Sequence, residues 1–275
     1  MDRERLTITL RKDILRRLDA LIDGITLRNR SHAIESFLEK ALTSKVDQAV
    51  VLAGGQGTNM RPLTLELPKA LIPVRGKPIL EYVIETLRDH GIRTVILCIG
   101  HMGDKIKNHI GDGSKYGVKI IYSEEKEPMG TAGAIRQAKS YLQPQPFLVV
   151  HGDVLAQIDI NEFIGFHQEQ ERMGTIALTT VSDTSSLGSV KLRGSTVIAF
   201  EEKPKNATSS HLVNAGIYMF EPEILDQIPD KGVVMLEDIF ANLAKEGKLA
   251  GFPFEGLWFD VSTPESYERA IKEWK

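Results

Sequence analysis

One aspartate lies where a divalent cation could bind. Asp153 follows the apolar run 147–150 after two residues, so it is expected at the carboxyl edge of a strand. Carboxylate oxygens are the ligands that Mg²⁺ prefers in proteins. Asp153 could therefore hold Mg²⁺, although an aspartate in an ordinary turn or helix cap would have the same local sequence. A second aspartate, Asp260, lies between Phe259 and Val261, an unusual place for a solvated charge.

A glycine-rich turn could bind phosphate. Residues 53–64 follow the apolar run 49–52 and contain Gly-Gly-x-Gly, and glycines let backbone N–H groups approach phosphate oxygens closely. The turn has neither the Gly-Lys-Ser/Thr of a Walker A loop nor the spacing of a dinucleotide-binding motif. Lys69 follows Pro68 in a loop expected to face the turn, where its ammonium could neutralise a triphosphate. Alone, such a turn is structural as often as functional, and Lys69 could be a solvated surface residue.

Alternating strands and helices are expected to position these residues. Apolar runs predict strands over 49–52, 94–99, 118–122, 147–151, 174–181 and 213–220, and a helix is expected over about 79–90. This alternation predicts an α/β fold, a Rossmann-like and mostly parallel mixed sheet with ligands at the carboxyl ends of its strands. The domain is expected to cover residues 47–275.

Composition limits the classes of partner. The net charge of −3 gives no global basic surface for nucleic acid, so such a partner needs a local patch. Cys98 is the only cysteine and lies in the apolar run 94–99, which predicts a buried thiol in a reducing compartment. No segment has the length of a membrane span, and the first twenty residues lack the apolar core of a signal peptide. We therefore expect a cytoplasmic protein without a membrane partner.

Residues 1–46 differ in character from the rest. Residues 1–45 hold ten Lys/Arg against seven Asp/Glu, a charge of +3, which leaves −6 for the remainder. Strict alternation over Arg5–Arg11 predicts a strand with Leu6, Ile8 and Leu10 on one face. Helices are expected over about 13–23, ending near Gly24, and from about Ser31, whose hydroxyl could cap the second helix. So short a segment cannot bury a core alone, which predicts a homodimer or a higher even oligomer.

This strand-helix-helix order resembles the ribbon-helix-helix DNA-binding family over about residues 3–43. The resemblance implies that two chains form an antiparallel ribbon that enters the major groove of double-stranded DNA. Arg5, Thr7 and Thr9 would then read base edges, and the N-terminus of the second helix, around Arg30 and Ser31, would hold a backbone phosphate. The alternative is that this element only dimerises.

The larger segment resembles the sugar-1-phosphate nucleotidyltransferase family over residues 48–274. The resemblance rests on ordered motifs: Gly-Gly-x-Gly-Thr with Pro-Leu-Thr, Pro-Lys-x-Leu at 68–71, Gly-Thr-Ala-Gly-Ala at 130–134, Gly-Asp-Val at 152–154, Glu-Lys-Pro at 202–204, Asn-Ala-Gly-Ile-Tyr at 214–218, and Trp-Phe-Asp-Val-Ser-Thr-Pro at 258–264. It implies a nucleoside triphosphate, a sugar 1-phosphate and Mg²⁺. The sequence 128–133 is most similar to the mannose-1-phosphate guanylyltransferase branch, which favours GTP and mannose 1-phosphate.

The resemblance also implies roles for particular residues. Asp260 would join Asp153 as the second metal carboxylate, and Lys69 would contact the triphosphate. Lys203 would clamp the sugar phosphate. The residues implied around the sugar are Gly188, Glu202, Lys203 and Asn214, and those around the nucleotide are Leu52, Gly54, Gly55, Gly57, Thr58, Gly130, Thr131 and Gly133. His151 is expected to be a packed histidine at a strand end, because the reaction needs no general base.

One departure from the family pattern bears on activity. Asn59 stands where the family usually has an arginine for the triphosphate, and Arg61 could compensate. Ser262 in place of a glycine near Asp260 is a milder deviation. The favoured hypothesis is an Mg²⁺-dependent nucleotidyltransferase that makes a nucleoside-diphosphate sugar and pyrophosphate. The alternative is a DNA-binding transcriptional regulator whose catalytically weakened second domain senses a sugar nucleotide.

Overall fold

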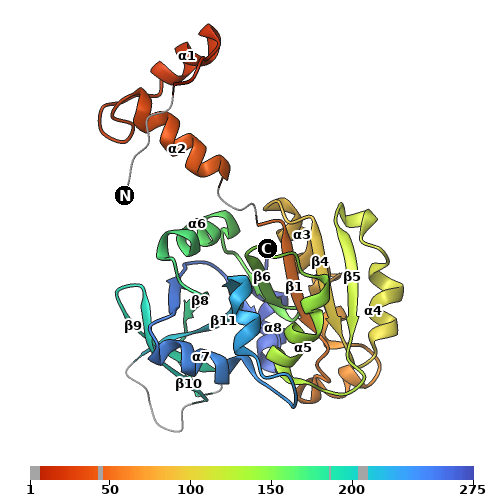
Figure 1. Cartoon of the computed structure of the whole chain (residues 1–275). Coiled ribbons are helices and arrows are strands. Elements are labelled where there is room, and N and C mark those ends of the chain that lie inside the picture. Colours follow the sequence, from red (N-terminus) through yellow and green to blue (C-terminus); the bar gives the residue numbers. More distant parts are fainter. Residues whose placement is uncertain (1–6, 43–45, 186, 204–209) are drawn as a thin grey trace. The chain divides into compact units, whose positions relative to one another are not determined.

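The chain forms two compact units, Met1–Lys45 and Val46–Lys275 (Figure 1). The computed structural model describes residues 7–42, 46–185, 187–203 and 210–275. Each unit is described by itself. Of the predicted DNA-reading residues, Arg5 lies outside the described residues, whereas Thr7 and Thr9 are exposed.

The first unit contains the helices α1 (Lys12–Asp19) and α2 (Arg30–Leu42). Helix α1 ends four residues before the predicted end at 23, and Gly24 lies beyond it with φ of +75°. Asn29, rather than Ser31, caps α2, because its Oδ1 accepts a hydrogen bond from the backbone N–H of His32 at 2.9 Å. The guanidinium of Arg30 is paired with the carboxylate of Asp19 through two hydrogen bonds of 2.6 and 2.7 Å.

The predicted strand over residues 5–11 does not form within this chain over its described part. Residues 7–11 carry no strand pairing, and the described residues of the unit contain only the two helices. A strand needs a neighbouring strand to complete its backbone hydrogen bonds, and this unit offers none. The ribbon formed with a second copy therefore stays a prediction.

The second unit is built on one nine-stranded sheet with the order β5-β4-β1-β6-β11-β8-β12-β10-β9. Its strands are β1 (Gln48–Ala53), β4 (Thr94–Ile99), β5 (Lys119–Glu124), β6 (Phe147–His151), β8 (Gly174–Thr180), β9 (Gly188–Arg193), β10 (Thr196–Glu202), β11 (Leu212–Phe220) and β12 (Leu249–Pro253). The strands β10 and β11 run against the other seven, so the sheet is mixed, and antiparallel pairings are more frequent than predicted.

Three strands of this sheet were not predicted, for identifiable reasons. In β10 only Val197 is buried, and a register shift between Val197 and Ala199 breaks the period-2 alternation. Strand β9 begins with Gly188, and its burial does not alternate from residue to residue, which weakens its strand signal. Strand β12 begins immediately after a Gly-Lys turn and contains a glycine and a proline.

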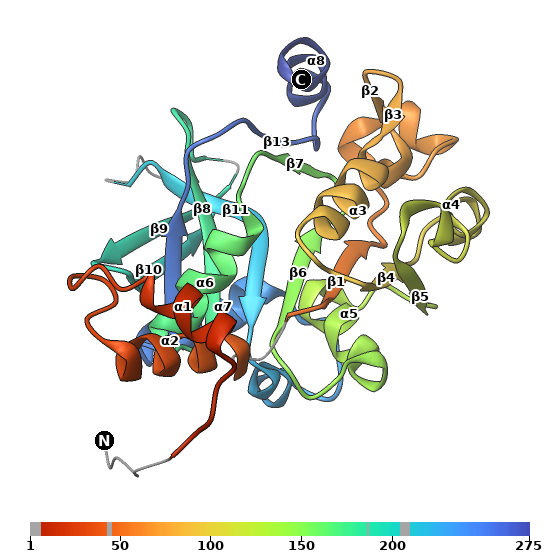
Figure 2. The same cartoon turned by 90° about the horizontal axis from the view of Figure 1, so that it is seen from above.

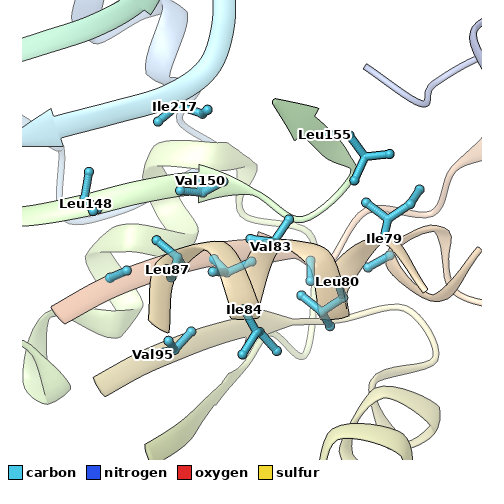
Figure 3. Packing of buried hydrophobic residues seen from close by; sticks show 14 of the residues in the cluster. Ile79, Leu80, Val83, Ile84, Leu87, Val95, Leu148, Val150, Leu155 and Ile217 are labelled. Carbon is cyan, nitrogen blue, oxygen red and sulfur yellow. The ribbon is translucent and has the colours of Figure 1, made fainter. Parts of the chain in front are cut away.

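Helices cover both faces of the sheet (Figure 2). The helices α3 (Ile79–Asp89), α4 (Gly103–Ile110), α6 (Ile160–Gln170) and α8 (Pro264–Glu273) share one apolar cluster with the sheet, and α5 (Gly130–Ala138) and α7 (Leu236–Lys245) share the other. Helix α3 shows why: Leu80, Val83, Ile84 and Leu87 recur at helical spacing and pack on the strands (Figure 3). In the described part of the chain, every helix is too short or too polar to cross a membrane.

Two short antiparallel strand pairs complete the unit. The strands β2 (Pro73–Val74) and β3 (Lys77–Pro78) form one, and β7 (Val154–Ala156) and β13 (Trp258–Asp260) form the other. In the second pair Asp260 lies opposite Val154. This register brings Asp260 beside Asp153, although more than a hundred residues separate them in the sequence.

Candidate active site

The glycines of the site lie at the carboxyl ends of adjacent parallel strands. Strand β1 lies between β4 and β6, so Gly54, Gly100 and Gly152 follow their strands at one edge of the sheet. A Cβ on Gly100 would lie 3.0 Å from the carbonyl oxygen of Gly54, and a Cβ on Gly152 would lie 3.1 Å from that of Leu52. The three loops approach so closely that larger residues would push them apart.

Two clefts open at this edge. The first, here called the glycine cleft, has a volume of about 590 Å³ and is lined by five of the predicted nucleotide residues, Leu52, Gly54, Gly55, Gly130 and Thr131. The second, here called the acidic cleft, has a volume of about 880 Å³ and is lined by all four predicted sugar residues, Gly188, Glu202, Lys203 and Asn214. His151 lines both clefts, Asp153 lines the first, and Asp260 lines the second.

Lys69, Asp153 and Asp260 form a charged cluster at the junction of the clefts. The ammonium of Lys69 donates a hydrogen bond to Oδ2 of Asp153 and lies 3.9 Å from Oδ1 of Asp260. Their side chains are 14, 23 and 30% exposed, so the cluster is only partly hydrated. The short helical turn 69–71 follows Pro68 and directs Lys69 at the two carboxylates.

Ser262 connects the members of this cluster. Its hydroxyl donates to Oδ1 of Asp260 and accepts from Nζ of Lys69 at 2.6 Å. A glycine at this position, the residue usual in the family pattern, would make neither contact. Ser262 thus completes a hydrogen-bonded chain from Asp153 through Lys69 to Asp260.

The two aspartates have different electrostatic environments. Burial disfavours the charged form of Asp153, but the charge and hydrogen bond of Lys69, together with His151 and a backbone hydrogen bond, outweigh burial and lower the pKa of this carboxyl group. Burial and the charge of Asp153 raise the pKa of Asp260, against the opposing effects of Lys69 and Ser262. Two carboxylates held close to each other are favoured electrostatically once a cation lies beside them.

The residues fit a bound Mg²⁺ ion. Mg²⁺ usually retains several waters and takes one or two protein carboxylates together with substrate phosphates. Asp153 and Asp260 offer such a pair, and Lys69 and Ser262 hold the two carboxylates in place. Among the residues that the structure describes, no larger group of metal-binding side chains occurs. The donor set therefore suits a hard cation shared with a ligand.

His151 is more than a packed strand-end residue. Its Nε2 lies 3.3 Å from the hydroxyl of Tyr218, which accepts a hydrogen bond from Nδ2 of Asn214 at 2.9 Å. Oδ1 of Asn214 accepts from the backbone N–H of Gly216 at 2.9 Å. Both polar ends of the Asn214 amide are thus engaged, and its position in the acidic cleft is fixed by Tyr218 and the bend at Gly216, where φ is +75°.

Gly188 makes room for the carboxylate of Glu202. A Cβ on Gly188 would lie 2.6 Å from the ring of Phe200 and 3.0 Å from Oε2 of Glu202. Glu202 ends strand β10 and Lys203 follows it, with the ammonium of Lys203 3.6 Å from Oε1 of Glu202. The backbone N–H of Lys203 is bonded to the carbonyl of Leu187, which ties β10 to the loop before Gly188.

The remaining predicted residues lie near the site without lining either cleft. Gly57, with φ of +61°, packs against Thr64, whose hydroxyl donates to the carbonyl of Gly57 at 2.7 Å. Thr58 and Arg61 are exposed and line neither cleft. Gly133 lies in the first turns of α5, and a Cβ there would lie 2.8 Å from Cβ of Met129. Asn59, in contrast, lines the acidic cleft.

Two glutamates that line the clefts were not predicted from the sequence. Glu125 lines the glycine cleft, and its Oε2 accepts a hydrogen bond from the backbone N–H of Met129 at 3.1 Å. Burial raises the pKa of Glu125. Glu237 lines the acidic cleft from the first turn of α7. Neither belongs to the ordered motifs of the family pattern, and an acidic residue in the first turn of a helix is common for reasons of the helix dipole alone.

Comparison with known proteins defines the family. The model of the family described as "Nucleotidyl transferase" matches residues 48–275, and the chain therefore belongs to this family. The chain is 36% identical over 224 residues to the mannose-1-phosphate guanylyltransferase catalytic subunit beta of Drosophila pseudoobscura pseudoobscura, covering 80% of this chain and 60% of the relative. It is also 36% identical over 231 residues to the probable mannose-1-phosphate guanylyltransferase 1 of Oryza sativa subsp. japonica, covering 82% of this chain and 64% of the relative.

Solved structures share the fold of the second unit. A putative glucose-1-phosphate thymidylyltransferase from Bacillus anthracis superposes with a TM-score of 0.76 at 26% identity, covering 82% of this chain and 94% of that one. HddC from Yersinia pseudotuberculosis, complexed with GMP-PN, gives a TM-score of 0.72 at 27% identity, covering 84% of this chain and 100% of that one. The chain spans about 60% of the length of the first relatives that it matches by sequence.

Proposed function

We propose that this protein transfers a nucleotidyl group from a nucleoside triphosphate to a sugar 1-phosphate with the help of Mg²⁺, and that GTP and mannose 1-phosphate are its preferred substrates. The observation that carries the proposal is the cluster of Lys69, Asp153 and Asp260, which lies where the glycine cleft meets the acidic cleft. The relatives' names support the choice of substrates.

The reaction joins two anions. A phosphate oxygen of the sugar 1-phosphate attacks the α-phosphorus of the triphosphate, the bond from this phosphorus to the bridging oxygen breaks, and pyrophosphate leaves with the bond's electron pair. Asp153 and Asp260 would hold Mg²⁺, which when bound offsets the negative charge of the phosphates. The protein positions the reactants: the glycine cleft takes the nucleotide, the acidic cleft takes the sugar, and Lys69 adds a positive charge at the junction.

Glu125 supports a guanine base. Guanine presents two adjacent donors, N1–H and the N2 amino group, whereas on the same edge adenine, cytosine and uracil have no two adjacent donors. A carboxylate only accepts hydrogen bonds, so it complements guanine and is repelled by the acceptors of the other bases. Oε2 of Glu125 is held by Met129, and the structure records no hydrogen bond to its Oε1 within the described residues. This fixed acceptor in the glycine cleft favours GTP.

The test is pyrophosphate release by the purified full chain with Mg²⁺, across four nucleoside triphosphates and a panel of sugar 1-phosphates. We expect turnover with GTP and mannose 1-phosphate, and its loss in Asp153→Asn. The control is Asp104→Asn, because Asp104 is an exposed aspartate of α4 that lines neither cleft. Pyrophosphate release that survives in Asp153→Asn, or binding of both substrates without any pyrophosphate, would contradict the proposal.

We further propose that a second copy of the chain covers the apolar side chains of the first unit. Ile14, Leu21, Phe37 and Leu38 are all at least 40% exposed, whereas Leu18 and Ala33 are its buried apolar residues within the described range. Burying such side chains is favourable, and the two short helices cannot do so alone. Sedimentation of the full chain should show a dimer that dissociates in Phe37→Glu, and a monomeric wild type would exclude this proposal. DNA binding by Arg5, Thr7 and Thr9 stays a prediction.

A further inference from the structure

The acidic cleft contains a buried acceptor without a partner. Oε2 of Glu237 is withdrawn from solvent and has no hydrogen-bond partner among the described residues. Burying an unpaired polar atom is unfavourable, and a charged oxygen more so than a neutral one. Buried polar groups without partners are few in folded proteins, and each requires an explanation. Glu237 lines the cleft, so a small shift of its side chain toward a bound ligand would give this oxygen a donor.

The packing of α7 fixes the position of this carboxylate. Phe240 lies one helical turn beyond Glu237, and its ring packs 5.4 Å from that of Phe200 and 5.1 Å from that of Tyr218. Phe200 and Tyr218 belong to β10 and β11, the strands that carry Glu202 and Asn214. Glu237 is therefore directed into the cleft by a rigid element, as a binding residue requires.

The segment before α7 is bonded to the turn that begins α5. The carbonyl of Val234 accepts from the backbone N–H groups of Ala132 and Gly133 at 3.0 and 3.2 Å, and the hydroxyl of Thr131 accepts from the N–H of Leu236 at 2.8 Å. Met235 lines the glycine cleft, and Glu237, two residues later, lines the acidic cleft. One short segment thus contributes to both clefts.

Two carboxylates face the same space. Burial and the nearby carboxylate of Glu237 raise the pKa of Glu202. Two acceptors close together suit a ligand that brings several donors, and the hydroxyl groups of a neutral sugar ring are such donors. An additional anionic group on the ring, as in a uronic acid, would be repelled by the same pair.

We propose that Glu237 recognises the sugar 1-phosphate, its carboxylate accepting a hydrogen bond from a ring hydroxyl. This inference rests on the proposed function, since it assigns the sugar to the acidic cleft. It makes Glu237 a determinant of sugar specificity that contacts the sugar and not the nucleotide.

The test compares Glu237→Gln with Asp238→Asn. Both changes remove one negative charge from the first turn of α7, but Asp238 is exposed and lines neither cleft. In Glu237→Gln we expect the KM for mannose 1-phosphate to rise about 10- to 100-fold, equal to about 1.4–2.8 kcal/mol, and the KM for GTP to change less than about twofold. In Asp238→Asn both values should stay at those of the wild type.

A series of monodeoxy mannose 1-phosphates identifies the hydroxyl. For one deoxy analogue the KM should be the same in the wild type and in Glu237→Gln, because the analogue lacks the hydroxyl that the charged carboxylate binds more strongly than a glutamine amide does. An unchanged KM for mannose 1-phosphate in Glu237→Gln, with a folded protein by circular dichroism, would overturn the inference while the proposed function stands. If calorimetry shows no sugar 1-phosphate or sugar nucleotide binding to the wild type, the proposed function fails and this inference with it.

Discussion

Replacement of Lys69 by methionine should separate the structural from the catalytic role of the charged cluster. Methionine keeps much of the side chain's length and removes the ammonium that contacts Asp153 and lies 3.9 Å from Asp260. The two carboxylates then face each other without a cation. Removing one partner of a fully buried ion pair costs about 3–5 kcal/mol. Because the side chains of this cluster are partly exposed to solvent, we expect the free energy of unfolding to fall by about 2–3 kcal/mol at pH 7 without Mg²⁺.

Mg²⁺ should restore much of this stability. A cation held by Asp153 and Asp260 supplies the missing positive charge, so Mg²⁺ should stabilise Lys69→Met more than it stabilises the wild type. Urea unfolding with MgCl₂ or with EDTA, followed by the fluorescence of Trp258 and Trp274, measures the difference. Pyrophosphate release should nevertheless stay at least about 100-fold below that of the wild type, because the positive charge that Lys69 offers the phosphates is gone.

The matched control is Lys77→Met. Lys77 pairs with Glu85, both side chains are about 30% exposed, and neither lines a cleft. This variant should lose at most about 1 kcal/mol of stability, show the wild-type response to Mg²⁺ and keep its activity. The reasoning is refuted if Lys69→Met is as stable as the wild type in EDTA, or if Mg²⁺ stabilises the two equally.

Four further results follow from the structure. Burial lowers the pKa of His167 to about 4 from 6.5, so the contribution of the neutral imidazole to stability is fully present above pH 6.5. As the pH falls to 4, the free energy of unfolding should decrease by about 3 kcal/mol. Urea unfolding of His167→Gln should lack this part of the pH dependence. Glu125→Gln should narrow the ratio of kcat/KM between GTP and UTP by roughly tenfold or more, and an unchanged ratio would remove Glu125 from base recognition. Asn59→Arg should raise kcat by roughly 10- to 1000-fold, whereas an unchanged slow turnover would show that Asn59 does not limit catalysis. Gly188→Ala places a Cβ 2.6 Å from the ring of Phe200 and should raise the KM for the sugar 1-phosphate, with about 1–3 kcal/mol lost from the free energy of unfolding.

The sequence predicted best those parts of the site that depend on local order along the chain. The apolar run 147–150 ends at the expected place, and the carboxyl ends of β1, β4 and β6 meet as a parallel arrangement requires. The position of Asp153 at the sheet edge therefore follows from the order of residues alone. The closeness of Asp260 depends on the pairing of β13 with β7, and no spacing in the sequence reveals that register. Only the family resemblance predicted that Asp260 joins Asp153.

Glu125 and Glu237 were not predicted, for a different reason. Glu125 follows β5 as an ordinary charged loop residue, and Glu237 occupies a helical position where an acidic side chain is favoured anyway. Only the tertiary packing of α7 on β10 and β11 turns Glu237 toward the cleft. The predicted strand over residues 5–11 is not formed over 7–11, its described part, for the opposite reason. Its sequence pattern is strong, but a strand needs a partner that the described residues of this unit do not provide.

The segment that the two clefts share should couple the binding of the two substrates. Gly130 has φ of +78°, and a Cβ there would lie 2.4 Å from the carbonyl oxygen of Val234. The turn that begins α5 therefore packs closely against the segment before α7. A nucleotide that orders the turn at Gly130 and Thr131 also orders the segment that ends at Glu237. Once the nucleotide has ordered this segment, binding of the sugar 1-phosphate costs less conformational entropy. The affinity for the sugar should therefore be higher in the nucleotide-bound protein. By linkage, the sugar must strengthen nucleotide binding by the same factor. Calorimetric titration of mannose 1-phosphate with and without a non-hydrolysable GTP analogue measures this factor, and equal affinities in the two titrations would show that the shared segment is already rigid in the free protein.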